Sequence, residues 1–130
     1  MYRWADHTAE VEFEIEADSE QQVLEDALHA LAELLGFSEG SGDEHRTIAA
    51  NAPDRPALLA AWLEELVFLA ESEGFVATRL EQLSLARDSL HATVGGELGD
   101  PPPLVKAVTY HRLEFAPTDR GYFARVVLDV

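Results

Sequence analysis

Carboxylates are the most abundant groups in this sequence that could do chemistry. Four of them alternate with apolar residues in one short segment: Glu10, Glu12, Glu14 and Glu16. A period of two indicates a strand, and the plainest explanation of the glutamates is that they form its solvent-exposed face. If the last strand of the chain runs antiparallel beside this one, Asp129 and the carboxylate of Val130 lie next to Glu10. Three converging carboxylates would form a site for a hard cation of the calcium type.

Other kinds of reactive site find little support. The chain has no cysteine, which excludes disulfides, thiolate metal sites and cysteine nucleophiles. Its five histidines lack the spacing of a two-histidine metal site, no glycine-rich phosphate loop follows a predicted strand, and no serine stands in a nucleophile-elbow sequence. Lys106 is the only lysine, and a single lysine on a strand is most often solvated.

The overall charge narrows the classes of partner. The 130 residues include 9 Lys and Arg against 25 Asp and Glu, a formal net charge of −16. Such a chain repels nucleic-acid phosphates unless one face is locally basic. No basic cluster occurs, so we expect no direct binding to nucleic acid. An acidic surface suits metal cations or a basic protein partner, although solubility or life at high salt explains it equally well.

The sequence also bears on location. No apolar run approaches the ~18 residues of a membrane span. The first residues lack the apolar core of a signal peptide. We therefore expect a cytoplasmic protein that does not bind a membrane.

Hydrophobic periodicity, together with residues that cap or end helices, predicts the elements that position these residues. After the strand at 10–17, Asp18 or Ser19 can cap a helix that Gly36 ends, and Asp54 and Gly74 bracket a second apolar helix. The other segments predicted as strands are 44–50, 75–87, 89–95, 105–115 and 122–130, with a loop over 95–103. This order predicts one α+β domain over residues 1–130, two-layered, with two helices packed on one face of a largely antiparallel sheet.

The apolar faces of these elements predict the core. Its predicted members are Val11, Phe13, Ile15, Leu24, Leu28, Leu31, Trp62, Leu66 and Val126. Strict alternation within 105–115 would place Lys106, Val108, Tyr110 and Arg112 together on the non-core face. In the last strand, Ala124, Val126 and Leu128 share one face, and Arg125, Val127 and Asp129 share the other.

Four segments, in this order along the whole chain, resemble the archease family. They are Asp6-His7-Thr8-Ala9-Glu10-Val11, Trp62-Leu63-Glu64-Glu65-Leu66, Val105-Lys106-Ala107-Val108-Thr109-Tyr110-His111 and the final Val127-Leu128-Asp129-Val130. Family members usually carry an aspartate where this chain has Glu10. Glutamate keeps the charge of that position and adds a methylene group.

The resemblance implies a function. Archeases are non-catalytic cofactors of the RtcB-type GTP-dependent RNA ligase, promoting its guanylylation and multiple turnover in tRNA splicing and RNA repair. It also implies a metal site at Glu10, Asp129 and Val130, for which oxygen ligands favour Ca²⁺ or Mg²⁺ over zinc. For contact with the ligase we predict Lys106, Asp6 and His7, and we expect the free protein to be a monomer.

Two other functions stay open on the residues alone. One is a small metal-dependent hydrolase that uses Glu10 and Asp129, although no histidine or evident base accompanies them. The other is a generic acidic chaperone or modulator of RNA-modifying proteins. An assay of ligase guanylylation separates all three.

Overall fold

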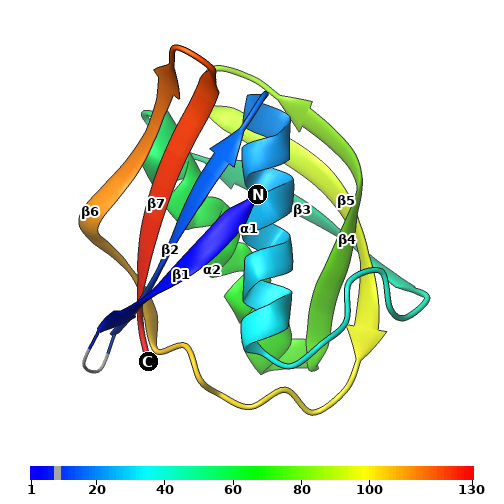
Figure 1. The fold of residues 1–130 in the computed structure, drawn as a ribbon. Helices are drawn as coiled ribbons and strands as arrows, with labels where there is room; N and C mark the ends of the chain where they lie inside the picture. The colour runs from blue at the N-terminus through cyan, green and yellow to red at the C-terminus, as the bar shows by residue number, and fades with distance from the viewer. Residues whose placement is uncertain (8–9) are drawn as a thin grey trace.

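The computed structural model describes residues 1–7 and 10–130, and for residues 5–7 it describes the backbone alone. Two helices and seven strands follow one another along the chain (Figure 1). Their bounds are β1 Tyr2–His7, β2 Glu10–Ala17, α1 Glu20–Leu34, β3 Glu44–Asn51, α2 Arg55–Glu73, β4 Phe75–Leu85, β5 Ser89–Leu98, β6 Ala107–Thr118 and β7 Gly121–Asp129. The predicted α+β class with antiparallel strands is confirmed. None of the helices in these described ranges is both long and apolar enough to cross a membrane.

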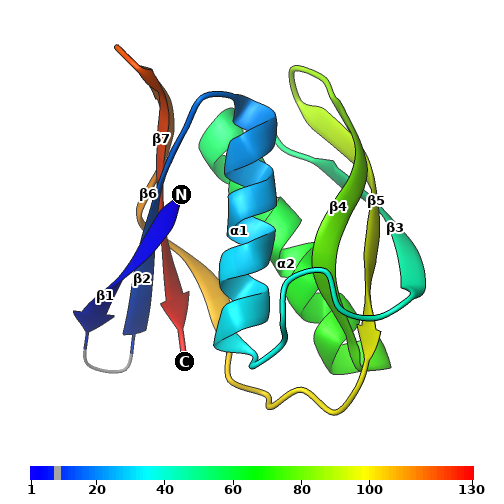
Figure 2. The same cartoon turned by 45° about the vertical axis from the view of Figure 1, so that its right-hand side comes forward.

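The strands form two sheets, whereas the sequence had suggested one. A four-stranded sheet has the order β1-β2-β7-β6 and a three-stranded sheet the order β3-β5-β4, with every pair antiparallel. The two helices lie between the sheets, so the molecule has three layers and not two (Figure 2). Helix α1 contacts β2 and β7 on one side and β4 on the other, and α2 contacts β6 as well as β3 and β4.

The composition of α2 explains the third layer. At 100° per residue, its buried side chains cover more than half of the helix surface. They are Leu58, Leu59, Ala60, Trp62, Leu63, Leu66, Leu69 and Ala70. A helix this widely apolar must be covered on two sides, which a single sheet cannot do.

The helix ends follow the sequence closely. The N–H of Gln22 donates to the Ser19 hydroxyl at 3.1 Å, and the N–H of Ala57 donates to the Asp54 carboxylate at 2.9 Å. Gly74 ends α2 with a φ of 68°, the left-handed conformation that glycine adopts at least cost. The predicted caps at these residues are confirmed.

Two strand assignments need correction. Strand β1 was not predicted, because only Tyr2, Arg3 and Trp4 alternate, which is too short a pattern to indicate a strand. It exists because it pairs with β2. Strand β5 runs to Leu98, through the start of the predicted loop. Gly96 makes this pairing possible, since a Cβ atom there would lie 2.1 Å from the Val76 carbonyl oxygen.

The core agrees with the sequence at eight of nine positions. The predicted residues that are buried are Phe13, Ile15, Leu24, Leu28, Leu31, Trp62, Leu66 and Val126. Val11 is only half-buried, because it stands at the start of β2, where it packs against the margin of the core. The Trp62 indole N–H donates to the Leu24 carbonyl oxygen at 2.9 Å, which fixes α2 against α1.

Candidate cation and partner site

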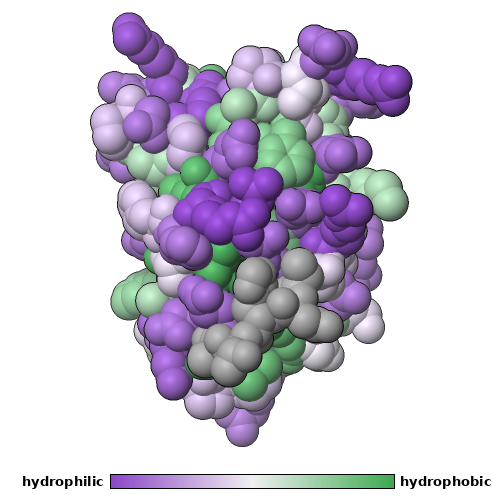
Figure 3. All heavy atoms as spheres, turned by 60° about the vertical axis from the view of Figure 1, so that its left-hand side comes forward, coloured by the Kyte–Doolittle hydropathy of each residue, from purple (hydrophilic) through white to green (hydrophobic). Residues whose placement is uncertain are grey.

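The outer face of the four-stranded sheet carries side chains in rows that run across the strands. One row, which we call the charge row, consists of Arg3, Glu14, Arg125 and Glu114, one residue from each strand in direct register. Glu14 accepts from Arg3 at 2.7 Å and lies 3.5 Å from Arg125, which donates to Glu114 at 3.0 Å. Opposite charges therefore alternate across the whole sheet, and hydrophilic residues gather on this side of the molecule (Figure 3).

The charge row perturbs the carboxyl at its centre. The hydrogen bond from Arg3, together with the charges of Arg3 and Arg125, holds the pKa of Glu14 below its ordinary value, against the opposing effect of partial burial. Glu14 is thus a structural carboxylate, ionised and hydrogen-bonded. It is a poor choice for a general acid.

The next row along the strands is buried, which corrects the prediction of a wet face. Glu12 is only 4% exposed and Val127 only 1% exposed, although both point away from the core. The Arg112 guanidinium lies 2.7 Å from the Glu12 carboxylate. Because β7 stands between β6 and β2, this arginine must reach across β7 at the level of Val127. Sequence reasoning had no signal for this contact, since the two residues are 100 positions apart.

Strand β6 departs from regular alternation to make that contact. Its pairing with β7 shifts between Thr109 and Glu114. The predicted common non-core face of Lys106, Val108, Tyr110 and Arg112 is wrong: Val108, which stands before the shift and opposite the core residue Leu128, is buried at 9% exposure, whereas Tyr110, within the shifted segment, is 63% exposed. A bulge of this size changes which side of the sheet each later residue faces.

The last row holds the acids that the sequence singled out. Glu10 lies directly opposite Asp129, in an antiparallel pairing of β2 with β7. Cross-strand neighbours in direct register have Cβ atoms about 5 Å apart, so the two carboxylates lie close together on one face of the sheet. Both side chains are half-buried. Among the described residues no ion pair neutralises either of them, in contrast to Glu14, which lies four residues further along β2. We call Glu10 and Asp129 the acid pair.

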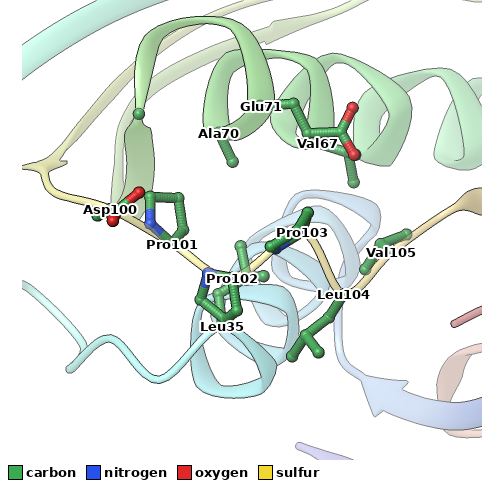
Figure 4. A pocket seen from close by; sticks show the side chains of 11 residues that line it. Leu35, Val67, Ala70, Glu71, Asp100, Pro101, Pro102, Pro103, Leu104 and Val105 are labelled. Carbon is green, nitrogen blue, oxygen red and sulfur yellow. The ribbon is translucent and has the colours of Figure 1, made fainter.

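The main chain of Lys106 contacts the strand that carries Asp129. A segment from Pro101 to Val105 crosses the ends of both helices above a groove of about 610 Å³, lined by apolar side chains such as Leu35 and Val67 (Figure 4). Val105 is buried, and the Lys106 N–H donates to the Asp129 carbonyl oxygen at 2.7 Å. The Lys106 side chain is exposed. This segment therefore brings the main chain of Lys106 against that of Asp129.

The remaining predicted residues are placed only in part. His7 stands opposite Glu10 in the pairing of β1 with β2, and Asp6 stands opposite Val11. Their side chains lie outside the described residues. Val130 follows Asp129 at the end of β7 and is half-buried against the core.

The acid pair has the chemistry of a hard-cation site. Two like charges in direct register repel each other, and oxygen donors are the ligands that Ca²⁺ and Mg²⁺ prefer. Within the described ranges, no three side chains of His, Asp or Glu gather closely enough to hold a metal ion. A cation here would need further oxygen atoms, such as those of Val130, or water.

Comparisons with known proteins agree in both sequence and fold. A model of the Archease protein family (MTH1598/TM1083) matches residues 2–130. The protein archease of Methanosarcina barkeri is 32% identical over 140 residues, which cover 100% of this chain and 96% of that protein. The protein archease of Archaeoglobus fulgidus is 31% identical, with 99% and 98% covered.

Two solved structures share the fold. The solution structure of protein 1598 from Methanobacterium thermoautotrophicum has a TM-score of 0.76 at 28% identity, covering 99% of this chain and 98% of that one. A crystal structure from Thermotoga maritima, described as an archease and possible chaperone, has a TM-score of 0.67 at 22% identity, covering 97% and 94%. The family model and the relatives match the chain over its length, and this protein belongs to the archease family.

Proposed function

We propose that this archease is a non-catalytic activator of an RtcB-type GTP-dependent RNA ligase, promoting guanylylation of the ligase and its multiple turnover. Family membership over residues 2–130 supports the proposal. The acid pair is the observation that supports a particular site for this activity. Glu10 and Asp129 stand in direct register, with no neutralising partner among the described residues. A half-buried pair of like charges in direct register would be stabilised by a cation from outside the chain.

The residues that would hold the cation are Glu10, Asp129 and the terminal carboxylate at Val130. Hard oxygen donors favour Ca²⁺ or Mg²⁺. When bound, the ion would supply positive charge at the edge of an otherwise acidic surface. Lys106 would add a compact, mobile ammonium group next to it, suited to a carboxylate or phosphate of the partner.

The activation itself would be a shift between states of the ligase. A protein without catalytic groups can speed another protein's reaction only by binding its competent conformation more tightly than its idle one. Net charge supports contact with the ligase rather than with RNA, because −16 opposes the approach of a phosphate backbone.

The test is a guanylylation assay of the cognate RtcB-type ligase with substoichiometric amounts of this protein. We expect the wild type to convert a single-turnover ligase into a multiple-turnover one. Asp129→Ala and Lys106→Ala should each reduce that stimulation about tenfold or more, as loss of an interface hot spot does. Asp119→Ala, an exposed acid in the β6–β7 turn at the far end of the same sheet, is the matched control and should stimulate normally.

A general chaperone role is the second candidate, supported by the description of the Thermotoga maritima protein as a possible chaperone. A chaperone would suppress aggregation of unrelated unfolded proteins and would not depend on Asp129. Stimulation of the ligase by wild type and Asp129→Ala alike, or failure of the wild type to stimulate at all, would contradict the activator proposal.

A further inference from the structure

Strand β6 contains a large bulge. Thr109 pairs with Val127 and Glu114 pairs with Arg125, so four residues of β6, 110–113, stand against one residue of β7, 126. An ordinary bulge sets two residues against one. Arg112 within it has a φ of 56°, the one positive φ of a non-glycine residue among those described. Such distortion persists only where the surroundings hold it in place.

Two contacts fix the conformation of this bulge. The Arg112 guanidinium crosses β7 to the buried Glu12 carboxylate at 2.7 Å. At its other end, the N–H of His111 donates to the Thr109 hydroxyl at 3.2 Å. A buried charge is stable only when it is paired, and the buried Glu12 carboxylate therefore holds the Arg112 guanidinium across β7.

The fixed bulge presents a tyrosine to solvent. Tyr110 is 63% exposed, which makes it one of the two most exposed aromatic side chains in the described structure, with Phe68 at 60%. It lies in the longest stretch of the sequence without an acidic residue, 101–113. Lys106, Tyr110 and His111 therefore offer hydrogen-bond donors in a protein whose surface otherwise offers mainly acceptors.

Protection of an exposed sheet edge is the plain alternative explanation. β6 is an edge strand, and bulges on edge strands prevent pairing with other chains. Edge protection, however, requires neither a buried glutamate nor an exposed aromatic ring, and a single lysine would achieve it. Edge protection alone therefore does not account for the buried Glu12 and the exposed Tyr110.

We infer that the β6 bulge is a docking element for the protein partner, in which Tyr110 inserts into an apolar pocket lined by acceptor groups. The inference rests on the proposed function, so the partner is the RtcB-type ligase. Glu12 and Arg112 are positioning residues that hold Tyr110 outward. RNA is the less suitable partner, because Glu12 neutralises Arg112 and the net charge of −16 opposes a phosphate backbone.

The first experiment compares Tyr110→Ala with Phe68→Ala, a matched control on α2 with nearly equal exposure. The affinity of each full-length variant for the cognate ligase is measured by titration calorimetry, and its thermal midpoint is measured in parallel. Tyr110→Ala should weaken binding about tenfold or more, as loss of an aromatic anchor does, while Phe68→Ala stays within about twofold of the wild type. Both thermal midpoints should remain close to that of the wild type, because both side chains are exposed.

The second experiment tests the positioning role. Glycine accepts a φ of 56° without strain, so Arg112→Gly removes the ion pair and leaves the backbone conformation accessible. We expect faster amide hydrogen exchange over 110–113 and severalfold weaker ligase binding, with partial recovery in Arg112→Lys. Normal binding by Arg112→Gly would overturn the positioning role.

The outcomes separate the two proposals. If the wild type does not bind the ligase, the proposed function fails and this inference fails with it. If the wild type binds but Tyr110→Ala binds as well as Phe68→Ala, only the docking element is overturned. A loss confined to RNA binding in Tyr110→Ala would likewise overturn the protein-docking inference and assign the bulge to nucleic acid.

Discussion

Single residues on the outer sheet face differ in whether their charge is balanced within the chain. Glu14 has Arg3 and Arg125 beside it, and Glu12 has Arg112. Glu10 faces Asp129, an acid, in direct register. Glu12 and Glu14 therefore form ion pairs that join strands, whereas the charge of Glu10 on the same face is not balanced by a described residue.

This imbalance predicts an unusual response to substitution. Like charges in direct register destabilise a sheet by about 0.2–1 kcal/mol, so Glu10→Gln should unfold at a slightly higher temperature than the wild type in EDTA. Millimolar Ca²⁺ should raise the thermal midpoint of the wild type, because a ligand that binds only the folded state stabilises it. The variant should lose that response, and Asp119→Asn should keep it.

A lower midpoint for Glu10→Gln in EDTA would show that Glu10 is already neutralised in the chain. An undiminished response to Ca²⁺ would place the cation elsewhere. Glu10→Asp, which restores the usual family residue, tests whether the extra methylene group weakens binding of the ion.

At the scale of elements, strands β1, β2, β7 and β6 are joined on their outer face by charged side chains as well as by the main chain. The charge row binds all four strands, and the Arg112–Glu12 pair binds β6 to β2 over the top of β7. The positive φ of Arg112 costs about 1–2 kcal/mol for a residue other than glycine. Glu12 is buried, but the Arg112 side chain is 45% exposed, so solvent screens this pair in part. The pair offsets some of the cost of the bulge.

The charge row predicts a pH dependence that belongs to this sheet. The pKa of Glu14 is lowered in the folded state by its hydrogen bond from Arg3, so the unfolded chain binds more protons as the pH falls below the ordinary value of about 4.5. The stabilisation from Glu14 is therefore complete above that pH and is lost as the pH falls through the lower, folded-state pKa. At neutral pH, Glu14→Gln should cost at most about 1 kcal/mol, as exposed ion pairs do.

The measurement is urea unfolding of the wild type and Glu14→Gln from pH 7 to pH 3, with Glu16→Gln, an exposed acid on the same strand face, as the control. The difference between wild type and Glu14→Gln should shrink as the pH falls. A difference that grows on acidification would contradict the lowered pKa.

At the scale of the whole molecule, 25 acidic residues against 9 basic ones leave a large negative excess. The ion pairs among the described residues involve eight acids, so most of the 25 are not in a close ion pair there, and their mutual repulsion is the larger electrostatic contribution to stability. The three-layer arrangement offsets it by covering both helices with sheet, which buries the apolar surface of α1 and α2 on two sides.

The charge excess predicts that salt stabilises this protein. Raising NaCl from about 0.05 M to about 1 M shortens the screening length from roughly 14 Å to roughly 3 Å, which weakens repulsion among the unpaired acids more than it weakens the close ion pairs. We expect the thermal midpoint to rise steadily over this range. A midpoint that falls with salt would show that the ion pairs outweigh the repulsion.

Local features of this protein could be determined from the sequence alone. The period of two at 10–17, the caps at Ser19 and Asp54 and the stop at Gly74 depend only on residues within a few positions of each other, and each appears in the structure as predicted. The core residues of these elements followed, because an apolar stripe must be buried whatever covers it. The resemblance to archeases also rested on short segments in order.

Features that depend on which strands pair were decided by the tertiary structure. The division into two sheets, the pairing of β1 with β2 and the bulge in β6 all arise from contacts between residues far apart in the chain. The burial of Glu12 is the clearest case: its sequence neighbours suggest a solvated face, whereas Arg112, 100 positions away, pairs with it in the folded chain. Alternation specifies a face within one strand, but register and bulges between strands decide what covers that face.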